Sequence, residues 1–387
     1  MRNPLRNLKT RNAVLQTLFV GGLAALVISG TLIAMRNLEA QGISSGFGFL
    51  SKATGLNVSF SLLPVTATDP YWWLLLIGFV NTIFLGFFGL LAATIVGMVV
   101  GLARTSANEV ASLLGTIYVE SFRNVPIILQ VIFWYAVLTH LPGPRDALEF
   151  GGMALSSRGV FLPMLNVGNG WLVLAVLALV AAVILPLFIS VSRKIAKPRE
   201  ERRALKITAT AVCLAVFAAA LLLGRPAGGS FVSVPMLKGL NFQGGLRIPP
   251  EFSALLIGIA VYGGSYIAEI VRGGFKSVSR GQIEAAQSLG LTRWQIFTRV
   301  RLPLALRAML PILANQYVWL IKATTLGITV GFTDFFMIVS LTINRSGQTL
   351  EAIFILMAGF LIINFTVAAV FNRINKAIAL KGNQLRT

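Results

Sequence analysis

The segment Ser279–Pro303 of this 387-residue chain, SRGQIEAAQSLGLTRWQIFTRVRLP, decides how the rest of the sequence is interpreted. Ser279 followed by Gln282 has the spacing of a capping box, in which a hydroxyl and an amide satisfy the free N–H groups at a helix start. Thr292 followed by Gln295 repeats this spacing. The segment therefore predicts two short helices in succession.

Gly290 stands between these helices, where the first would end in a left-handed residue. Pro303 would end the second helix, because proline removes a hydrogen-bond donor from a helix interior. Ala285 and Ala286 are small and follow the carboxylate of Glu284. Such a knob can enter a groove on another protein. Periodicity alone leaves open a second interpretation, in which the helix pair lies on lipid headgroups.

The composition on either side of this knob indicates a membrane protein. Hydrophobic residues make up 56% of the chain and charged residues 12%, and the mean hydropathy is +0.80, which a water-soluble surface does not carry. A spanning helix needs about 20 apolar residues. This criterion predicts an all-α, polytopic membrane protein with about eight spans: Ala13–Met35, Ile77–Ala103, Leu113–Leu138, Trp171–Val191, Leu205–Gly224, Phe252–Ile270, Pro311–Val330 and Ala352–Phe371.

The distribution of charge predicts the orientation of these spans. The net charge is +20, which in a soluble protein would suggest nucleic-acid binding. With the N-terminus inside, about 23 of the 33 Lys and Arg lie in cytoplasmic segments and about eight outside, as the positive-inside rule requires. Both termini and the knob are then cytoplasmic. The basic run 193–206 would fix topology and meet anionic lipid headgroups, and no nucleic acid is expected.

Two parts follow from this topology. Residues 1–70 are expected to hold an N-terminal spanning helix, too long for a cleaved signal, and an external linker. Residues 71–387 hold the remaining spans, with an inserted two-helix segment at about 139–250 and a cytoplasmic loop at about 271–307. One cysteine, Cys213, and one histidine, His140, exclude a disulfide framework and a zinc site.

The order of residues in the knob resembles the EAA loop of ABC importer permeases. Glu284-Ala285-Ala286 is followed after three residues by Gly290, and after nine more by Val300, where isoleucine is usual; Leu302-Pro303 then follows. Further blocks resemble the polar amino-acid permease family, and together they cover roughly residues 71–138 and 249–378. These blocks are Tyr118–Pro126 with Gln130, Ala268–Gly274 and Lys322–Leu326.

The extra N-terminal helix and the insertion make the layout similar to the Q-type permease of general L-amino-acid importers, whose relatives handle glutamate, glutamine, aspartate and asparagine. The resemblance implies a type I ABC importer fold in a bacterial inner membrane. It also implies three partners: a nucleotide-binding ATPase, a second, M-type permease and a periplasmic amino-acid-binding protein. The docking residues that it implies for the ATPase are Glu284, Ala285, Ala286, Gly290, Leu302 and Pro303.

No G-x-x-x-x-G-K-[ST] run occurs in the sequence, so ATP and Mg are expected on the ATPase and no cofactor on this chain. A secondary transporter remains an alternative, although it would normally show inverted repeats and intramembrane acids. A membrane-embedded enzyme is disfavoured, because its chemistry needs clusters of His, Cys or acids.

Lys322 is the first candidate for contact with substrate. If a helix starts at Pro311, Lys322 lies 11 residues inside it, about 17 Å along the axis and near the bilayer midplane. A lysine there costs about 2.5–3.5 kcal/mol on insertion scales, which marks it as functional by default. The alternative is a lysine neutralised by Asp334, Glu120 or backbone carbonyls.

Neighbouring residues indicate the substrate class. Family members that move cationic substrates often have Glu at the position of Gln316 and Asp at the position of Ala323, and both carboxylates are missing here. A pocket of Gln316, Lys322, Thr324 and Thr325 would suit neutral or acidic amino acids.

Two acid–base pairs have i, i+3 spacing on expected helices. Glu120 and Arg123 either neutralise each other or gate the substrate path. Glu269 and Arg272 lie close to the cytoplasmic end of their helix and are expected to pair and support the knob.

Overall fold

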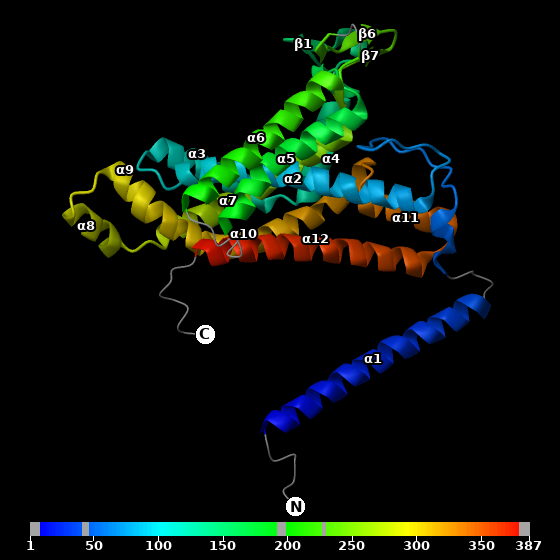
Figure 1. Ribbon diagram of the computed structural model, residues 1–387, viewed down its shortest axis with the longest axis horizontal. Coiled ribbons are helices and arrows are strands. Elements are labelled where there is room, and N and C mark those ends of the chain that lie inside the picture. Colours follow the sequence, from blue (N-terminus) through cyan, green and yellow to red (C-terminus); the bar gives the residue numbers. More distant parts are fainter. Residues whose placement is uncertain (1–7, 41–45, 192–198, 227–229, 379–387) are drawn as a thin grey trace, which may run out of the picture.

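The computed structural model describes residues 8–40, 46–191, 199–226 and 230–378. The described chain is mostly helical, and helices α2, α7, α10 and α12 run side by side (Figure 1). The α-helices are α1 (Leu8–Ala40), α2 (Tyr71–Ala103), α3 (Glu109–Asn124), α4 (Ile127–Thr139), α5 (Asn169–Val191), α6 (Arg199–Leu223), α7 (Pro250–Lys276), α8 (Arg280–Ser288), α9 (Arg293–Ile296), α10 (Leu302–Lys322), α11 (Phe335–Ser346) and α12 (Thr349–Ile378). The tighter or wider helical turns are η2 (Phe47–Ser51), η3 (Pro144–Asp146), η4 (Phe297–Arg301) and η5 (Ala323–Val330).

Six helices of the described chain are long and apolar enough to cross a membrane, or seven if one bent pair counts as a single span. These correspond to seven of the eight expected spans. The eighth is α5, a helix of 23 residues with Pro186 inside it. It packs along α6, and several of its side chains lie outside the described part of the chain.

The bent pair corrects the expected continuous span Leu113–Leu138. The chain there forms α3 and α4, whose axes differ by 100°. Val125, between them, is extended, with φ −95° and ψ 126°. Pro126 explains the break, because the residue before a proline is disfavoured in helical conformation.

Helices α2 and α7 form the centre of the bundle and run parallel with a constant offset. Small residues on α2 lie against branched side chains on α7, with Gly89 opposite Ile259 and Gly97 opposite Ile267. A Cβ built at Gly97 would lie 2.5 Å from the Cβ of Ile267. The missing side chains therefore allow the two backbones to approach closely.

This packing gives a first prediction. Gly97→Ala should destabilise the protein by about 1–3 kcal/mol, because the added methyl meets a branched Cβ that cannot turn away. Gly30→Ala is the matched control, since no heavy atom lies within 4 Å of a Cβ at Gly30. Thermal unfolding of the detergent-solubilised protein measures both. Equal unfolding temperatures for the two variants would show that the α2–α7 contact tolerates separation.

Eight short strands, which were not expected, accompany the helices of this mostly helical fold. They lie within the insertion and comprise β1 (Leu148–Phe150), β2 (Met153–Ser156), β3 (Gly159–Leu162), β4 (Met164–Leu165), β5 (Val232–Ser233), β6 (Met236–Lys238), β7 (Asn241–Gln243) and β8 (Leu246–Ile248). The largest sheet has the order β1-β2-β3-β8, and antiparallel pairing of β3 with β8 sets Val160 opposite Ile248. The beginning and end of the insertion are thereby joined. Strands of two to four residues are too short to show an alternating pattern.

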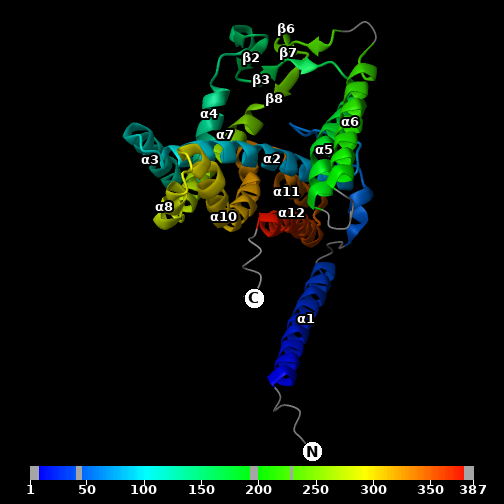
Figure 2. The ribbon, with the colours of Figure 1, turned by 60° about the vertical axis from the view of Figure 1, so that its left-hand side comes forward.

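The two ends of the bundle differ (Figures 1 and 2). Helices α8 and α9 lie at one end, and α11 with residues 46–70 lies at the other. Asn81 on α2 ties this linker down, because its side-chain N–H groups donate to the backbone oxygens of Phe60 at 3.1 Å and Thr333 at 2.8 Å. Helix α1 lies apart from the other helices, and its described side chains are exposed.

Candidate functional site

The knob consists of α8, α9 and the turn at Gly290 between them. Gly290 has φ +74°, a left-handed conformation that glycine adopts without a Cβ penalty. Its N–H donates to Gln287 O at 2.9 Å, and the N–H of Leu291 donates to Ala286 O at 3.2 Å. These two bonds satisfy the last carbonyls of α8 in the pattern of a Schellman motif, so the expected elbow is confirmed.

One of the two expected capping boxes is present. The Thr292 hydroxyl accepts from the N–H of Gln295, and the Gln295 side chain accepts from the N–H of Thr292 at 2.9 Å. The box expected at Ser279 was wrong, because its side chain makes no capping bond. There the N–H of Gln282 donates to the backbone oxygen of Ser279 at 3.2 Å instead.

The second helix of the knob continues past Pro303, contrary to expectation. Residues Phe297–Arg301 form a π-helical turn, and Pro303 lies in the first turn of α10. A π turn changes the hydrogen-bond ladder at the point where proline cannot donate. Arg293–Val330 consequently passes the membrane-span criterion as one segment of 38 residues.

The outer surface of the knob carries large apolar side chains that sequence reasoning missed. Glu284 and Ala285 are exposed, whereas Ala286 is only 4% exposed and packs inward. Leu289 and Trp294 are 80% and 71% exposed, at either side of the Gly290 elbow. Aromatic residues are enriched where proteins meet. An apolar residue adjoining a glycine helix end was the sequence signal available for Leu289.

An ionic cluster joins the helices beneath the knob. The expected pairing of Glu269 with Arg272 is confirmed, and the Arg272 Nε donates to Glu269 Oε2 at 3.0 Å. Arg104, at the end of α2, was missed: its Nη1 lies 2.6 Å from the same carboxylate oxygen, and its side chain is only 8% exposed. Arg104 Nε also lies 3.4 Å from Thr116 Oγ1 on α3. One carboxylate therefore ties α2 and α7 together, and Arg104 extends the cluster to α3.

Lys322 lies at the end of α10, where the helix tightens into η5. The position argued from a helix start at Pro311 was wrong, because Pro311 lies inside α10. From Leu302, Lys322 is about 30 Å along the helix at 1.5 Å per residue. The side chain is exposed in this chain. No ion pair of Lys322 with Asp334 or Glu120 is recorded among the described residues.

The expected polar pocket is rearranged. Thr324 is fully buried and donates to Ile321 O at 2.7 Å, and Thr325 donates to Lys322 O at 2.8 Å. Gln316 is six residues before Lys322, about 120° away around the helix, whereas Asn315 shares the face of Lys322. The structure thus does not gather all four residues beside one another. Asn315 was missed, although its spacing of seven residues was readable.

An aromatic ladder leads from exposed Trp319 on α10 through the buried ring of Tyr262 on α7 toward α3. The ring centroids of Trp319 and Tyr262 are 5.5 Å apart, and those of Tyr262 and Tyr266 are 4.9 Å apart. The Arg123 guanidinium lies 6.0 Å from the centre of the Tyr266 ring. Glu120 is exposed, and the described chain records no ion pair between it and Arg123. Sequence reasoning missed the ladder, although the two tyrosines have helical i, i+4 spacing.

Known proteins resemble this chain along most of its length. Residues 207–379 match the family model described as binding-protein-dependent transport system inner membrane component. The putative amino-acid ABC transporter permease protein YhdX of Escherichia coli K12 is 36% identical, covering 89% of this chain and 88% of its own. The general L-amino acid transport system permease protein AapQ of Rhizobium johnstonii is 35% identical, and the match covers 89% of this chain and 86% of the relative. The chain belongs to the amino-acid ABC transporter permeases.

A third relative is the glutamate/glutamine/aspartate/asparagine transport system permease protein BztB of Rhodobacter capsulatus, 32% identical over 96% of this permease and 93% of the relative. Because these similarities run along nearly the whole permease, they show its function as well as its fold. It is a membrane-spanning subunit of an ATP-driven amino-acid importer with the type I fold. Coupling to an ATPase is favoured over secondary transport.

The matched region of the permease includes the knob, the π turn and Lys322, all of which lie within residues 207–379. Arg123 and Glu120 lie outside it. Permeases of this kind work in general with an ATPase and a binding protein, and they are components of an inner membrane.

Proposed function

We propose that the knob transmits the conformational change of an ATPase to this permease. L-amino acids then pass along the face that carries Lys322 and the aromatic ladder. One observation supports both halves: the knob helix α9 and Lys322 lie on the single helical segment Arg293–Val330. Displacement of the knob would therefore move Lys322. ATP and Mg bind to the separate ATPase in this proposal, and this chain binds no cofactor.

The knob fits a docking role by its chemistry. Glu284 is the sole acid between Ser279 and Pro303 in the sequence, and it is exposed on α8. Leu289 and Trp294 supply apolar surface to either side of the elbow. A buried apolar contact with one oriented charge gives both affinity and a fixed orientation. Leu302 and Pro303 act at the root of the knob, where they begin α10.

The substrate face offers two cations separated by aromatic rings. Lys322 and Arg123 can each donate hydrogen bonds to a carboxylate. The aromatic ladder lies between them and consists of Trp319, Tyr262 and Tyr266. Charge-assisted bonds to carboxylate are about twice as strong as neutral ones. This arrangement supports transport of polar, neutral or acidic amino acids, and the name of the BztB relative agrees with that class.

A second permease closes this path in the proposal. Lys322 and Trp319 are exposed in this chain, Trp319 to 41%. A lysine within the membrane has to face protein or a water-filled cavity. An M-type permease on this face would complete the path in a bacterial inner membrane, and a periplasmic binding protein would deliver the amino acid from outside.

Lys322→Ala tests the substrate face. Loss of one charge-assisted bond, about 1.5–3 kcal/mol, should raise the substrate concentration needed for half-maximal stimulation of ATP hydrolysis roughly 10- to 100-fold. Assembly should be unchanged, and Lys322→Arg, which keeps the charge, should lose less. The reconstituted importer with its binding protein provides the measurement. Wild-type stimulation and unchanged affinity in Lys322→Ala would remove Lys322 from the path.

A further inference from the structure

The hairpin of α5 and α6 stands outside the knob and the substrate face. Its two helices pack against each other, and the β-strands join its outer end to α4 and α7 (Figure 2). At the other end, the first two turns of α6 carry the bases Arg199, Arg202, Arg203 and Lys206 and the acids Glu200 and Glu201, so this end is basic by a net charge of two. The charge argument places this end in the cytoplasmic leaflet.

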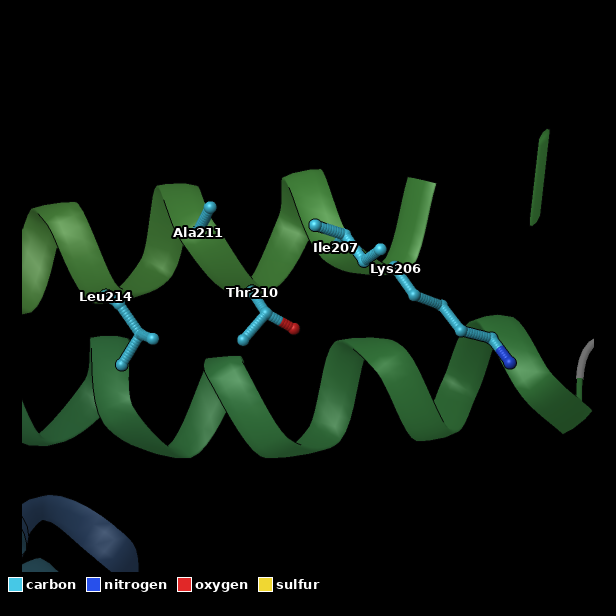
Figure 3. A pocket seen from close by; sticks show the side chains of 5 residues that line it. All are labelled: Lys206, Ile207, Thr210, Ala211 and Leu214. Carbon is cyan, nitrogen blue, oxygen red and sulfur yellow. The ribbon is translucent and has the colours of Figure 1, made fainter. Parts of the chain in front are cut away.

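A groove opens beside this basic end of α6. Its volume is about 360 Å³, and its lining residues are Lys206, Ile207, Thr210, Ala211 and Leu214 (Figure 3). The side chains of Thr210 and Leu214 point toward the neighbouring helix α5, and Lys206 extends along it. No hydrogen bond or ion pair of the Lys206 amine is recorded among the described residues.

The lining changes character along the helix axis. Thr210 lies about 6 Å deeper than Lys206, and Leu214 about 12 Å deeper, at 1.5 Å per residue. The polar layer of each leaflet is about 5–8 Å thick. An amine at headgroup depth, a hydroxyl at its inner edge and an aliphatic side chain below follow the order of a phospholipid: phosphate, glycerol ester and acyl chain.

We propose that this groove holds one anionic phospholipid of the cytoplasmic leaflet, with its phosphate on Lys206 and an acyl chain along Ala211 and Leu214. Charge complementarity favours lipid over a helix of another protein. Such a helix would have to bring a carboxylate to the depth of Lys206, whereas anionic phospholipids bring a phosphate to that depth everywhere in the leaflet. Arg203 adds to the surrounding positive field.

The lipid would hold the hairpin at a fixed depth. Thr210 and Leu214 face α5, so a chain lying against them contacts the seam of the hairpin. The site thereby differs from general attraction of a basic surface to lipid, which needs no groove. The test therefore compares a basic residue that lines the groove with one that does not.

Retention of dioleoyl-phosphatidylglycerol by the purified, full-length permease, measured by native mass spectrometry against dioleoyl-phosphatidylcholine, tests the site. Lys206→Gln should weaken phosphatidylglycerol retention at least about tenfold, the loss of one charge-assisted hydrogen bond to phosphate, and Lys206→Arg should preserve it. Arg203→Gln is the matched control, because it removes the same charge from an exposed residue that does not line the groove. It should change retention less than twofold.

Equal losses in Lys206→Gln and Arg203→Gln, or no preference for phosphatidylglycerol in the wild type, would overturn the proposal. A photoreactive benzophenone side chain at Leu214 provides a second measurement, which does not depend on Lys206. A covalent adduct with the mass of a phospholipid supports the site. An adduct to another polypeptide shows that protein fills the groove and refutes it.

Discussion

Glu284→Lys should abolish co-purification of the ATPase and ATP-dependent amino-acid uptake while leaving the permease folded. The change turns the only acid of the knob into a base, among Arg280, Arg293 and the arginines of the π turn. Removing one partner of a buried charge pair at an interface costs about 2–5 kcal/mol. We therefore expect association with the ATPase to weaken at least about 30-fold, measured by pull-down from co-expressing membranes.

Gln287→Lys is the matched control, because it adds a positive charge at an exposed position of the same helix. It should retain much more ATPase than Glu284→Lys. The shape of the elbow is tested by Gly290→Val against Gly290→Asn, since asparagine tolerates the left-handed conformation far better than a β-branched residue. If Glu284→Lys binds ATPase and drives uptake like the wild type, the docking role of the knob is wrong.

Glu269→Gln should cause the largest loss of stability among single substitutions in the ionic cluster. It leaves Arg104, only 8% exposed, without its carboxylate, and it removes the partner of Arg272. Loss of one member of a buried ion pair costs about 3–5 kcal/mol. Because Glu269 itself is 30% exposed, we expect a value near the lower limit, about 3 kcal/mol.

The unfolding temperature of the solubilised permease measures this effect. Glu120→Gln is the matched control, since Glu120 is an exposed helical carboxylate with no recorded ion pair in the described chain. It should unfold close to the wild-type temperature. The double variant Arg104→Met, Glu269→Gln should recover part of the loss, because no unpaired charge then remains on α2. Wild-type stability of Glu269→Gln would contradict the clamping role of the cluster.

Features that depend on local chemistry could be predicted from the sequence. The elbow at Gly290 and the box at Thr292 follow from backbone groups that only neighbouring residues satisfy. Pairing of Glu269 with Arg272 follows from helical spacing. Arg104 could not be found in this way, because it is 165 residues away from Glu269 along the chain and reaches it only through the packing of α2 on α7.

Proline caused the errors in helix boundaries. The prediction ran a helix through Pro126, where the chain bends sharply. It ended one helix at Pro303 and began the next at Pro311, and both prolines lie within the segment Arg293–Val330. The outcome at each proline depends on whether the chain offers a compensating backbone geometry. A π turn does so before Pro303, and the sequence carries no mark that distinguishes it.

The composition of the candidate substrate face was only partly readable. Lys322 and Arg123 stand out as charges within apolar sequence, but threonine hydroxyls that bond their own helix, as in Thr324, resemble ligand-binding hydroxyls on paper. Tyr262 and Trp319 were passed over because aromatic residues are ordinary in a membrane core. Their significance comes from their stacking: exposed Trp319 lies three residues from Lys322 and packs on the buried ring of Tyr262.

The interlocking of α2 with α7 has a consequence for how the importer alternates between its outward-open and inward-open states. Gly89, Gly97 and Gly101 of α2 lie directly against the branched side chains of Ile259, Ile267 and Val271 of α7, so neither helix can slide or rotate without steric conflict. α7 leads into the knob and α10 leads out of it. Helices α2 and α7 are thus built to tilt together as one rigid unit that carries the knob at its end.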